Sequence, residues 1–204
     1  MPRPTAPHPL APRKKPGQTR SAATVAAVLE AAARILETEG LEGYTTNAVA
    51  RRAGISIGSL YQYFPSKEAI TKALILRETA TLLKDVEAID VKARGRVGLE
   101  RLIRVAVAYQ LQRPALARIL DQEERRLPLD EEVQHAGESL ARTVQRCLDA
   151  PGLAAVARSP STAGDLLAIV KGLVDAAGER GERDSTALIA RVHRAVFGYL
   201  EYTP

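Results

Sequence analysis

The sequence contains few aromatic residues and a single cysteine. Among its 204 residues are two Phe, six Tyr and no Trp. One Cys excludes an intramolecular disulfide framework and favours a reducing cytoplasm. No apolar run approaches the roughly 18 residues that a membrane-spanning helix needs, and no apolar segment of a signal peptide follows the basic N-terminal residues. We therefore expect a soluble cytoplasmic protein with no membrane partner.

Positive charge is concentrated in the first third of the chain. Residues 1–67 hold nine Lys or Arg against four Asp or Glu, whereas residues 68–204 hold twenty of each. Such an asymmetry indicates a polyanion-binding end on a neutral body. A basic segment that only aids solubility is the alternative.

Residues 1–19 form the first of three expected segments. Proline at six positions excludes a helix or a central strand, so a disordered basic arm is expected. An arm of this kind can follow phosphates or enter a minor groove, and a passive tail is equally compatible with the composition. Residues 20–67 are expected to form a DNA-binding domain and residues 68–204 a helical body.

Apolar residues recur at helical spacing through the rest of the chain, with no alternating β-branched run that would indicate a strand. The fold class is therefore all-α, with roughly nine helices. Gly and Pro residues that end helices, and Ser and Thr residues that cap them, mark the boundaries between these helices. The expected helices begin near Ser21, Thr46, Ser56 and Ser66, and then span about 95–112, 115–126, 130–149, 161–180 and 184–202.

The two short helices before Pro65 have the pattern of a helix-turn-helix. Ala50 and Ala53 are small where two helices must cross closely, and Gly54 permits the positive φ of a tight turn. Leu60 and Phe64, four residues apart, are expected to face inward. The rest of the second helix is uncharged and is left for the surface.

The stretch "TTNAVARRAGISIGSLYQYFPSKEAI" resembles the DNA-binding signature of the TetR/AcrR family of bacterial transcriptional regulators. The resemblance covers about 45 residues, and "GSLYQYF" followed by "SKEAI" is its most specific part. It implies a cytoplasmic bacterial protein, at the nucleoid when it is bound to double-stranded DNA. The positions that match DNA-contacting residues of the family are Thr46, Asn47, Ile57, Gly58, Ser59, Tyr61, Tyr63 and Lys67.

The roles of these residues also follow from the resemblance. Tyr61, Tyr63 and Lys67 match sugar-phosphate contacts. Because Ile57 and Gly58 carry no hydrogen-bonding group, base recognition is expected to depend on Ser59, Asn47, thymine methyl contacts and DNA shape. Buried packing is the alternative for the two tyrosines.

The last two expected helices form an αα-hairpin with wide apolar stripes. The family resemblance implies that this hairpin meets its twin in a homodimer, which would place two DNA-reading helices on a palindromic operator. The alternative is packing within one chain, and a mixture of the two is favoured. The interface residues expected on this basis are Leu166, Ile169, Val170, Leu173, Leu188, Val192, Val196 and Tyr199.

A small-molecule effector site in the middle helices is implied only by the resemblance. Its candidate residues are Tyr109, which lies on an apolar stripe so that its hydroxyl needs a buried partner or a ligand, and Lys171, which borders one. Structural roles are the alternative for both. Cys147 is interpreted as core, and His135 as exposed. No His or Cys has metal-ligand spacing, so no metal or other cofactor is expected. The charge run "DQEERRLPLDEE" is interpreted as solvated, with Glu123 or Arg125 at a pocket mouth as the alternative.

Three classes of function remain open on the sequence. The leading one is a ligand-responsive, homodimeric transcriptional repressor. An enzyme is disfavoured because the body lacks a phosphate loop, a nucleophile motif and an acid–base pair. A helical interaction module with an inactive helix-turn-helix is the third.

Overall fold

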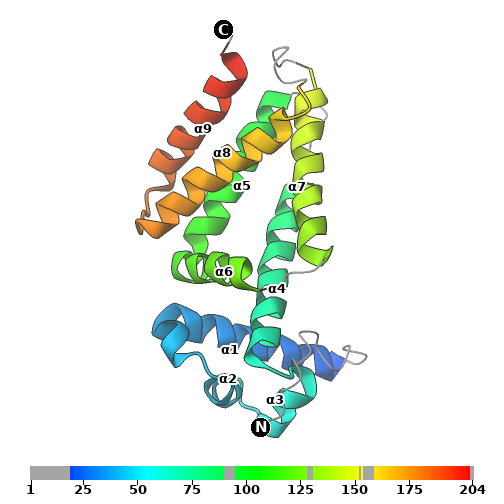
Figure 1. The fold of residues 1–204 in the computed structure, drawn as a ribbon, viewed down its shortest axis with the longest axis vertical. Helices are drawn as coiled ribbons and strands as arrows, with labels where there is room; N and C mark the ends of the chain where they lie inside the picture. Colours follow the sequence, from blue (N-terminus) through cyan, green and yellow to red (C-terminus); the bar gives the residue numbers. More distant parts are fainter. Residues whose placement is uncertain (1–18, 90–94, 128–130, 152, 154–158, 203–204) are drawn as a thin grey trace, which may run out of the picture. The chain divides into compact units, whose positions relative to one another are not determined.

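The computed structural model describes the chain except for residues 1–18, 90–94, 128–130, 152, 154–158 and 203–204. The expected disordered arm, residues 1–19, falls almost entirely outside the described part. The described residues form nine α-helices and no strand, which confirms the all-α prediction (Figure 1). None of these helices is long and apolar enough to cross a membrane.

The helices begin and end close to the positions predicted from the capping and helix-ending residues of the sequence. Helix α1 is kinked at Gly40, where the backbone turns to φ 66°. The bounds are α1 Thr19–Gly43, α2 Thr46–Arg52, α3 Ile57–Tyr63, α4 Lys67–Glu87, α5 Gly95–Gln112, α6 Pro114–Arg126, α7 Glu131–Asp149, α8 Thr162–Glu179 and α9 Ser185–Glu201.

Side-chain caps fix the starts of the short N-terminal helices. The Thr45 hydroxyl accepts a hydrogen bond from the Ala48 amide, and the Ser56 hydroxyl accepts one from the Ser59 amide. The Ser66 hydroxyl does the same for the Ala69 amide at the start of α4. Each cap pairs one backbone N–H that the first turn of a helix leaves free.

The chain divides into two compact units. The N-terminal unit comprises Met1–Arg77 and Ile119–Leu129, and the C-terminal unit comprises Glu78–Arg118 and Asp130–Pro204. Helices α4 and α6 each contribute residues to both units. In the N-terminal unit α1 packs on α2, and α2 packs on α3.

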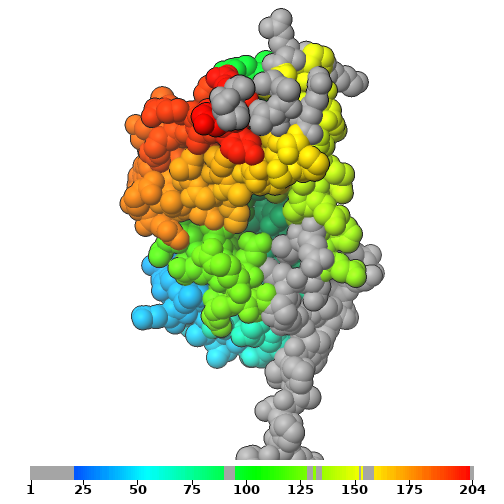
Figure 2. Space-filling view, turned by 45° about the horizontal axis from the view of Figure 1, so that its top comes forward, coloured from blue at the N-terminus to red at the C-terminus, as the bar shows by residue number. Residues whose placement is uncertain are grey.

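In the C-terminal unit, α5 packs against α7, α8 and α9 around one apolar core. Helices α8 and α9 form the hairpin that the sequence predicts (Figure 1). The space-filling view shows them, in orange and red, as one continuous surface (Figure 2). The Tyr199 hydroxyl joins the two helices by donating to Asp165 Oδ2 at 2.6 Å.

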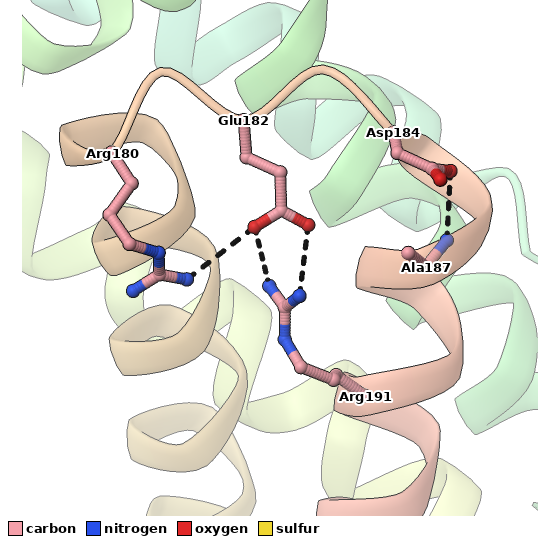
Figure 3. A network of polar contacts seen from close by, with 5 residues as sticks. All are labelled: Arg180, Glu182, Asp184, Ala187 and Arg191. Carbon is pink, nitrogen blue, oxygen red and sulfur yellow. Dashed lines mark hydrogen bonds and ion pairs between the residues drawn. The ribbon is translucent and has the colours of Figure 1, made fainter.

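A glycine and an ion pair set the turn between α8 and α9. Gly181 has φ 67°, and the amides of Gly181 and Glu182 donate to the carbonyls of Gly178 and Ala177, the pattern of a Schellman cap. Both Glu182 carboxylate oxygens then accept from the Arg191 guanidinium, at 2.9 and 2.8 Å (Figure 3). These hydrogen bonds lower the pKa of Glu182.

Candidate nucleic-acid interface

The helix-turn-helix is held by a small buried core. Leu60 and Phe64 are both fully buried, as predicted; Leu60 lies on the inner side of α3, and Phe64 is the C-cap residue of that helix. Val49 and Ala50 fill the inner side of α2. Gly54, between the two helices, has φ 69°, which a residue with a side chain rarely adopts. The inner residues therefore fix which side of α3 remains at the surface.

The outward side of α3 is uncharged and open. The exposed fractions of Ile57 and Tyr61 are 37% and 42%, which is high for such large apolar side chains. A Cβ at Gly58 would meet only the Ser56 hydroxyl oxygen, at 3.9 Å. Glycine inside a helix costs about 0.5–1 kcal/mol relative to alanine. Packing within the described chain therefore does not require glycine at position 58. The lack of a side chain there leaves space at the surface for an external partner.

Hydroxyl groups surround this open side. Ser59 Oγ lies 2.9 Å from Ser56 Oγ, so its hydroxyl is partly engaged by the cap of its own helix. Thr46 Oγ1 lies 3.2 Å from the Tyr61 hydroxyl oxygen, a hydrogen bond between the start of α2 and the middle of α3. Asn47 is exposed beside Thr46, and Tyr63 is half-buried at the end of α3.

The electrostatic setting favours a polyanion. Neither α2 nor α3 contains an acidic residue. Their N-termini therefore present backbone N–H groups and the positive end of the helix dipole without a competing carboxylate. Arg51 and Arg52 are exposed in the last turn of α2.

Lys67 lies at the start of α4 with its ammonium over an aromatic ring. Its Nζ is 5.6 Å from the centroid of the Tyr44 ring, and Tyr44 itself is 1% exposed. Lys67 is one of the predicted DNA contacts, whereas Tyr44 has no predicted role. The structure thus brings seven of the eight predicted DNA-contacting residues onto α2 and α3 and adds Lys67 from α4 within the same unit.

The predicted dimer-interface residues fall into two groups. Leu166, Leu188, Val192 and Val196 are fully buried in the core of the C-terminal unit, the intrachain role that the sequence left open. Ile169, Val170, Leu173 and Tyr199 are only partly buried.

The exposed side of the hairpin has small residues. A Cβ added at Gly164, Gly172 or Gly198 would meet nothing within 4 Å. Ala168, Ala187 and Ala190 are exposed as well.

The predicted effector residues do not line the apolar cavity of the C-terminal unit. Lys171 forms an ion pair with Asp175 at 3.2 Å, and its side chain is 61% exposed. Tyr109 is half-buried. The cavity has a volume of about 30 Å³, and all its lining side chains are apolar. They come from α5, α7, α8 and α9: Leu99, Leu102, Ile103, Val144, Leu166, Leu167, Val170 and Val196.

Glu123 and Gln110 are among the buried polar residues of the described chain. Glu123, expected in a solvated charge run, is 8% exposed and accepts from Arg126 Nη1 at 2.7 Å. That part of the prediction is wrong, because Glu123 lies on the inner side of α6 while its neighbour Arg125 is exposed. Gln110 is 3% exposed, and its Nε2 has no hydrogen-bond partner.

Cys147 and His135 lie where they were predicted. Cys147 is fully buried, and burial raises its thiol pKa to about 11. His135 is exposed. Within the described residues, no three His, Cys, Asp or Glu side chains are grouped so that they could hold a metal ion.

Comparison with known families identifies both parts of the chain. Residues 28–74 match the family model of bacterial regulatory proteins of the tetR family, and residues 96–200 match the tetracyclin repressor-like C-terminal domain. The chain belongs to the TetR family. It is thus a DNA-binding transcriptional regulator, and α2 and α3 are its helix-turn-helix.

Solved structures share the fold across nearly the whole chain. A tetR-family regulatory protein from Rhodococcus RHA1 superposes with a TM-score of 0.72 at 18% identity, covering 89% of this chain and 98% of that one. The fatty acid degradation regulator FadR from Bacillus halodurans gives 0.69 at 19% identity, covering 93% and 100%.

Curated relatives are similar over shorter stretches. The nucleoid occlusion factor SlmA of Glaesserella parasuis is 31% identical over 94 residues, which are 46% of this chain and 47% of that protein. The A-factor receptor protein of Streptomyces griseus is 35% identical over 65 residues, 32% of this chain and 24% of the receptor. The matches to SlmA thus span about half the length of that protein.

Proposed function

We propose that this TetR-family protein is a homodimeric repressor that binds a palindromic operator, is released by a small-molecule effector and has no catalytic activity. The main support for this proposal is that the outward side of α3 is open and uncharged, with Gly58 at its start. A helix surface without acidic groups does not repel the phosphates beside the major groove, and a small residue leaves room for close approach to the bases.

The proposed contacts to DNA are of two kinds, contacts to bases and contacts to phosphates. Ile57 offers an apolar contact to thymine methyl groups, and Ser59 and Asn47 offer hydrogen bonds to base edges. Thr46, Tyr61, Tyr63 and Lys67 supply hydroxyl and ammonium groups for phosphates, which fix position without reading sequence. Much of the base preference then comes from the shape and deformability of the operator.

The homodimer is proposed to form through the exposed side of α8 and α9. Three helical glycines there, Gly164, Gly172 and Gly198, have no intrachain neighbour that requires them. Small residues let a second pair of helices approach closely, and the partly buried Ile169 and Tyr199 flank the same hairpin. A two-fold axis through such an interface pairs two α3 helices on one operator.

The effector is proposed to bind by enlarging the apolar cavity between α5, α7, α8 and α9. At about 30 Å³ the cavity has space for little more than one water, and its apolar lining gives that water no partner. The lining favours an effector with a substantial apolar part.

A mobility-shift titration with the DNA upstream of the protein's own gene tests the proposal. The wild type should bind this DNA more tightly than a scrambled duplex, and Tyr63→Ala and Lys67→Ala should weaken binding without loss of helical structure. Gly58→Leu should abolish specific binding, because its side chain occupies the space in front of α3.

Gly137→Leu is the matched control. Gly137 is, like Gly58, an exposed helical glycine. A Cβ built on Gly137 would meet nothing within 4 Å, but Gly137 lies on α7 in the C-terminal unit. Specific binding by Gly58→Leu, or equal affinity of the wild type for both duplexes, would contradict the proposal.

A further inference from the structure

Tyr44 connects the segment before α2 to the first turn of α4. Its hydroxyl oxygen lies 3.1 Å from Thr71 Oγ1, and the Thr71 hydroxyl donates to the Lys67 carbonyl at 3.1 Å. The Tyr44 hydroxyl also lies 3.5 Å from the Lys67 carbonyl oxygen, to which it can donate, and either hydroxyl can be the donor between Tyr44 and Thr71. Burial raises the pKa of the Tyr44 phenol well above its ordinary value, so the ring keeps its proton.

The face of the same ring lies under the Lys67 ammonium. The distance of 5.6 Å from Nζ to the ring centroid is within the range of a cation–π interaction. The ring is 1% exposed and cannot itself reach a ligand. Lys67 is only partly buried, so its side chain combines the contact of its ammonium with the ring and partial exposure to solvent.

We propose that Tyr44 is a positioning residue for the phosphate contact of Lys67: the buried ring holds the ammonium at the surface of the helix-turn-helix before DNA arrives. A free lysine side chain loses much rotamer freedom when it binds a phosphate. Ordering it in the unbound protein reduces that loss on binding. This inference rests on the proposed DNA contact of Lys67.

A purely structural role for Tyr44 makes different predictions. If Tyr44 only filled the core, its loss would lower the stability of the protein and would weaken DNA binding equally with or without Lys67. If it acts through Lys67, its loss has no further effect on DNA affinity once the ammonium is gone. A double-mutant cycle separates these two cases.

The experiment measures anisotropy of a labelled duplex carrying the DNA upstream of the gene over a series of salt concentrations. The variants are Lys67→Gln, Tyr44→Leu, Tyr44→Phe and the double variant Tyr44→Leu/Lys67→Gln, with helical content recorded for each.

Lys67→Gln should reduce the slope of log affinity against log salt by about 0.9 for each protomer bound. Tyr44→Leu should weaken binding roughly two- to fivefold in the wild-type background. It should have no effect in the Lys67→Gln background. Tyr44→Phe, which keeps the ring face, should bind like the wild type.

A proton spectrum of the free wild type tests the ring contact directly, even where Tyr44→Leu does not fold. The ring should shift the ε-methylene protons of Lys67 upfield, and Tyr44→Phe should retain this shift. Ordinary lysine shifts, or an equal effect of Tyr44→Leu in both backgrounds, would overturn the inference. Failure of the wild type to bind any duplex at low salt would instead overturn the proposed function.

Discussion

The hydroxyl groups of Thr46 and Tyr61 lie 3.2 Å apart and join the first turn of α2 to α3. Tyr61 is 42% exposed, so this hydrogen bond is formed at the surface rather than in the core. The pair orders both hydroxyls at the edge of the open side of α3. On our account a phosphate of the DNA backbone binds to them there.

Removing the Tyr61 hydroxyl should therefore weaken DNA binding while leaving the fold intact. Hydrogen bonds to charged groups contribute about 1.5–3 kcal/mol, so Tyr61→Phe is expected to lower affinity by roughly tenfold or more. Binding titrations at constant salt measure this change. Tyr202→Phe, in which the altered tyrosine is 71% exposed at the end of α9, is the matched control and should bind like the wild type. Equal affinity of Tyr61→Phe and wild type would exclude a phosphate contact by this hydroxyl.

The glycines of α8 and α9 lead to a prediction about assembly. Gly172→Leu and Gly198→Leu should convert a dimer into a folded monomer, because each adds a large side chain to the proposed contact surface. Sedimentation of the variants at several concentrations gives their mass. Gly137→Leu on α7 should remain dimeric. If the two hairpin variants kept the mass of the wild type, the dimer surface would lie elsewhere.

The unpaired amide of Gln110 predicts an increase in stability on substitution. A buried donor without a partner costs about 1–3 kcal/mol, and Gln110→Met removes it while keeping most of the volume. The free energy of unfolding in urea should rise by about 1 kcal/mol. Gln112→Met, an exposed substitution two residues further along α5, should leave it nearly unchanged. A loss of stability in Gln110→Met would indicate that the amide is hydrogen-bonded in solution.

Gly178 provides a second test of the same site. A Cβ there would lie 2.2 Å from Gln110 Nε2, so Gly178→Ala should destabilise the protein. Shortening the opposing side chain with Gln110→Ala should remove most of that penalty. In urea unfolding, the double variant should therefore be more stable than the sum of the two single-variant effects predicts. If the two substitutions changed the free energy of unfolding independently, Gln110 and position 178 would not be in contact.

The Glu182–Arg191 ion pair predicts a pH-dependent contribution to stability (Figure 3). The folded-state pKa of Glu182 is lowered, chiefly by its hydrogen bonds to Arg191. Its stabilising effect is therefore present above the ordinary glutamate pKa of about 4.3 and is lost as the pH falls through the lower folded-state value.

Thermal unfolding of the wild type and Glu182→Gln measures this contribution. The wild type should melt at the higher temperature at neutral pH, and the difference should vanish in acid. Glu179→Gln, which removes an exposed carboxylate in the last turn of α8, is the control. A difference between wild type and Glu182→Gln that does not change with pH would mean that the ion pair does not form.

Local chemistry made the helix boundaries predictable. Ser56 and Gly54 act within a few residues of their own position, as a cap and as a positive-φ turn, so their effects can be derived from the sequence. The spacing of Leu60 and Phe64 likewise identified the inner side of α3. The candidate DNA-contacting residues followed from this local geometry together with the family signature.

Contacts between distant residues were not predictable in the same way. The ring of Tyr44 and the ammonium of Lys67 are separated by 23 residues, and periodicity within one helix gives no information about such a pair. Gln110 and Gly178 meet only because α5 packs on α8. The burial of Glu123 depends on the packing of α6, which a run of charged residues does not reveal.

Footprinting of the purified protein on the DNA upstream of its gene shows whether it reads an operator as a symmetric dimer. We expect a protected site made of two inverted half-sites about one helical turn apart, or a multiple of that spacing, with protection lost in Gly58→Leu. Uniform cleavage, or protection of any sequence supplied, would rule out operator binding of this kind.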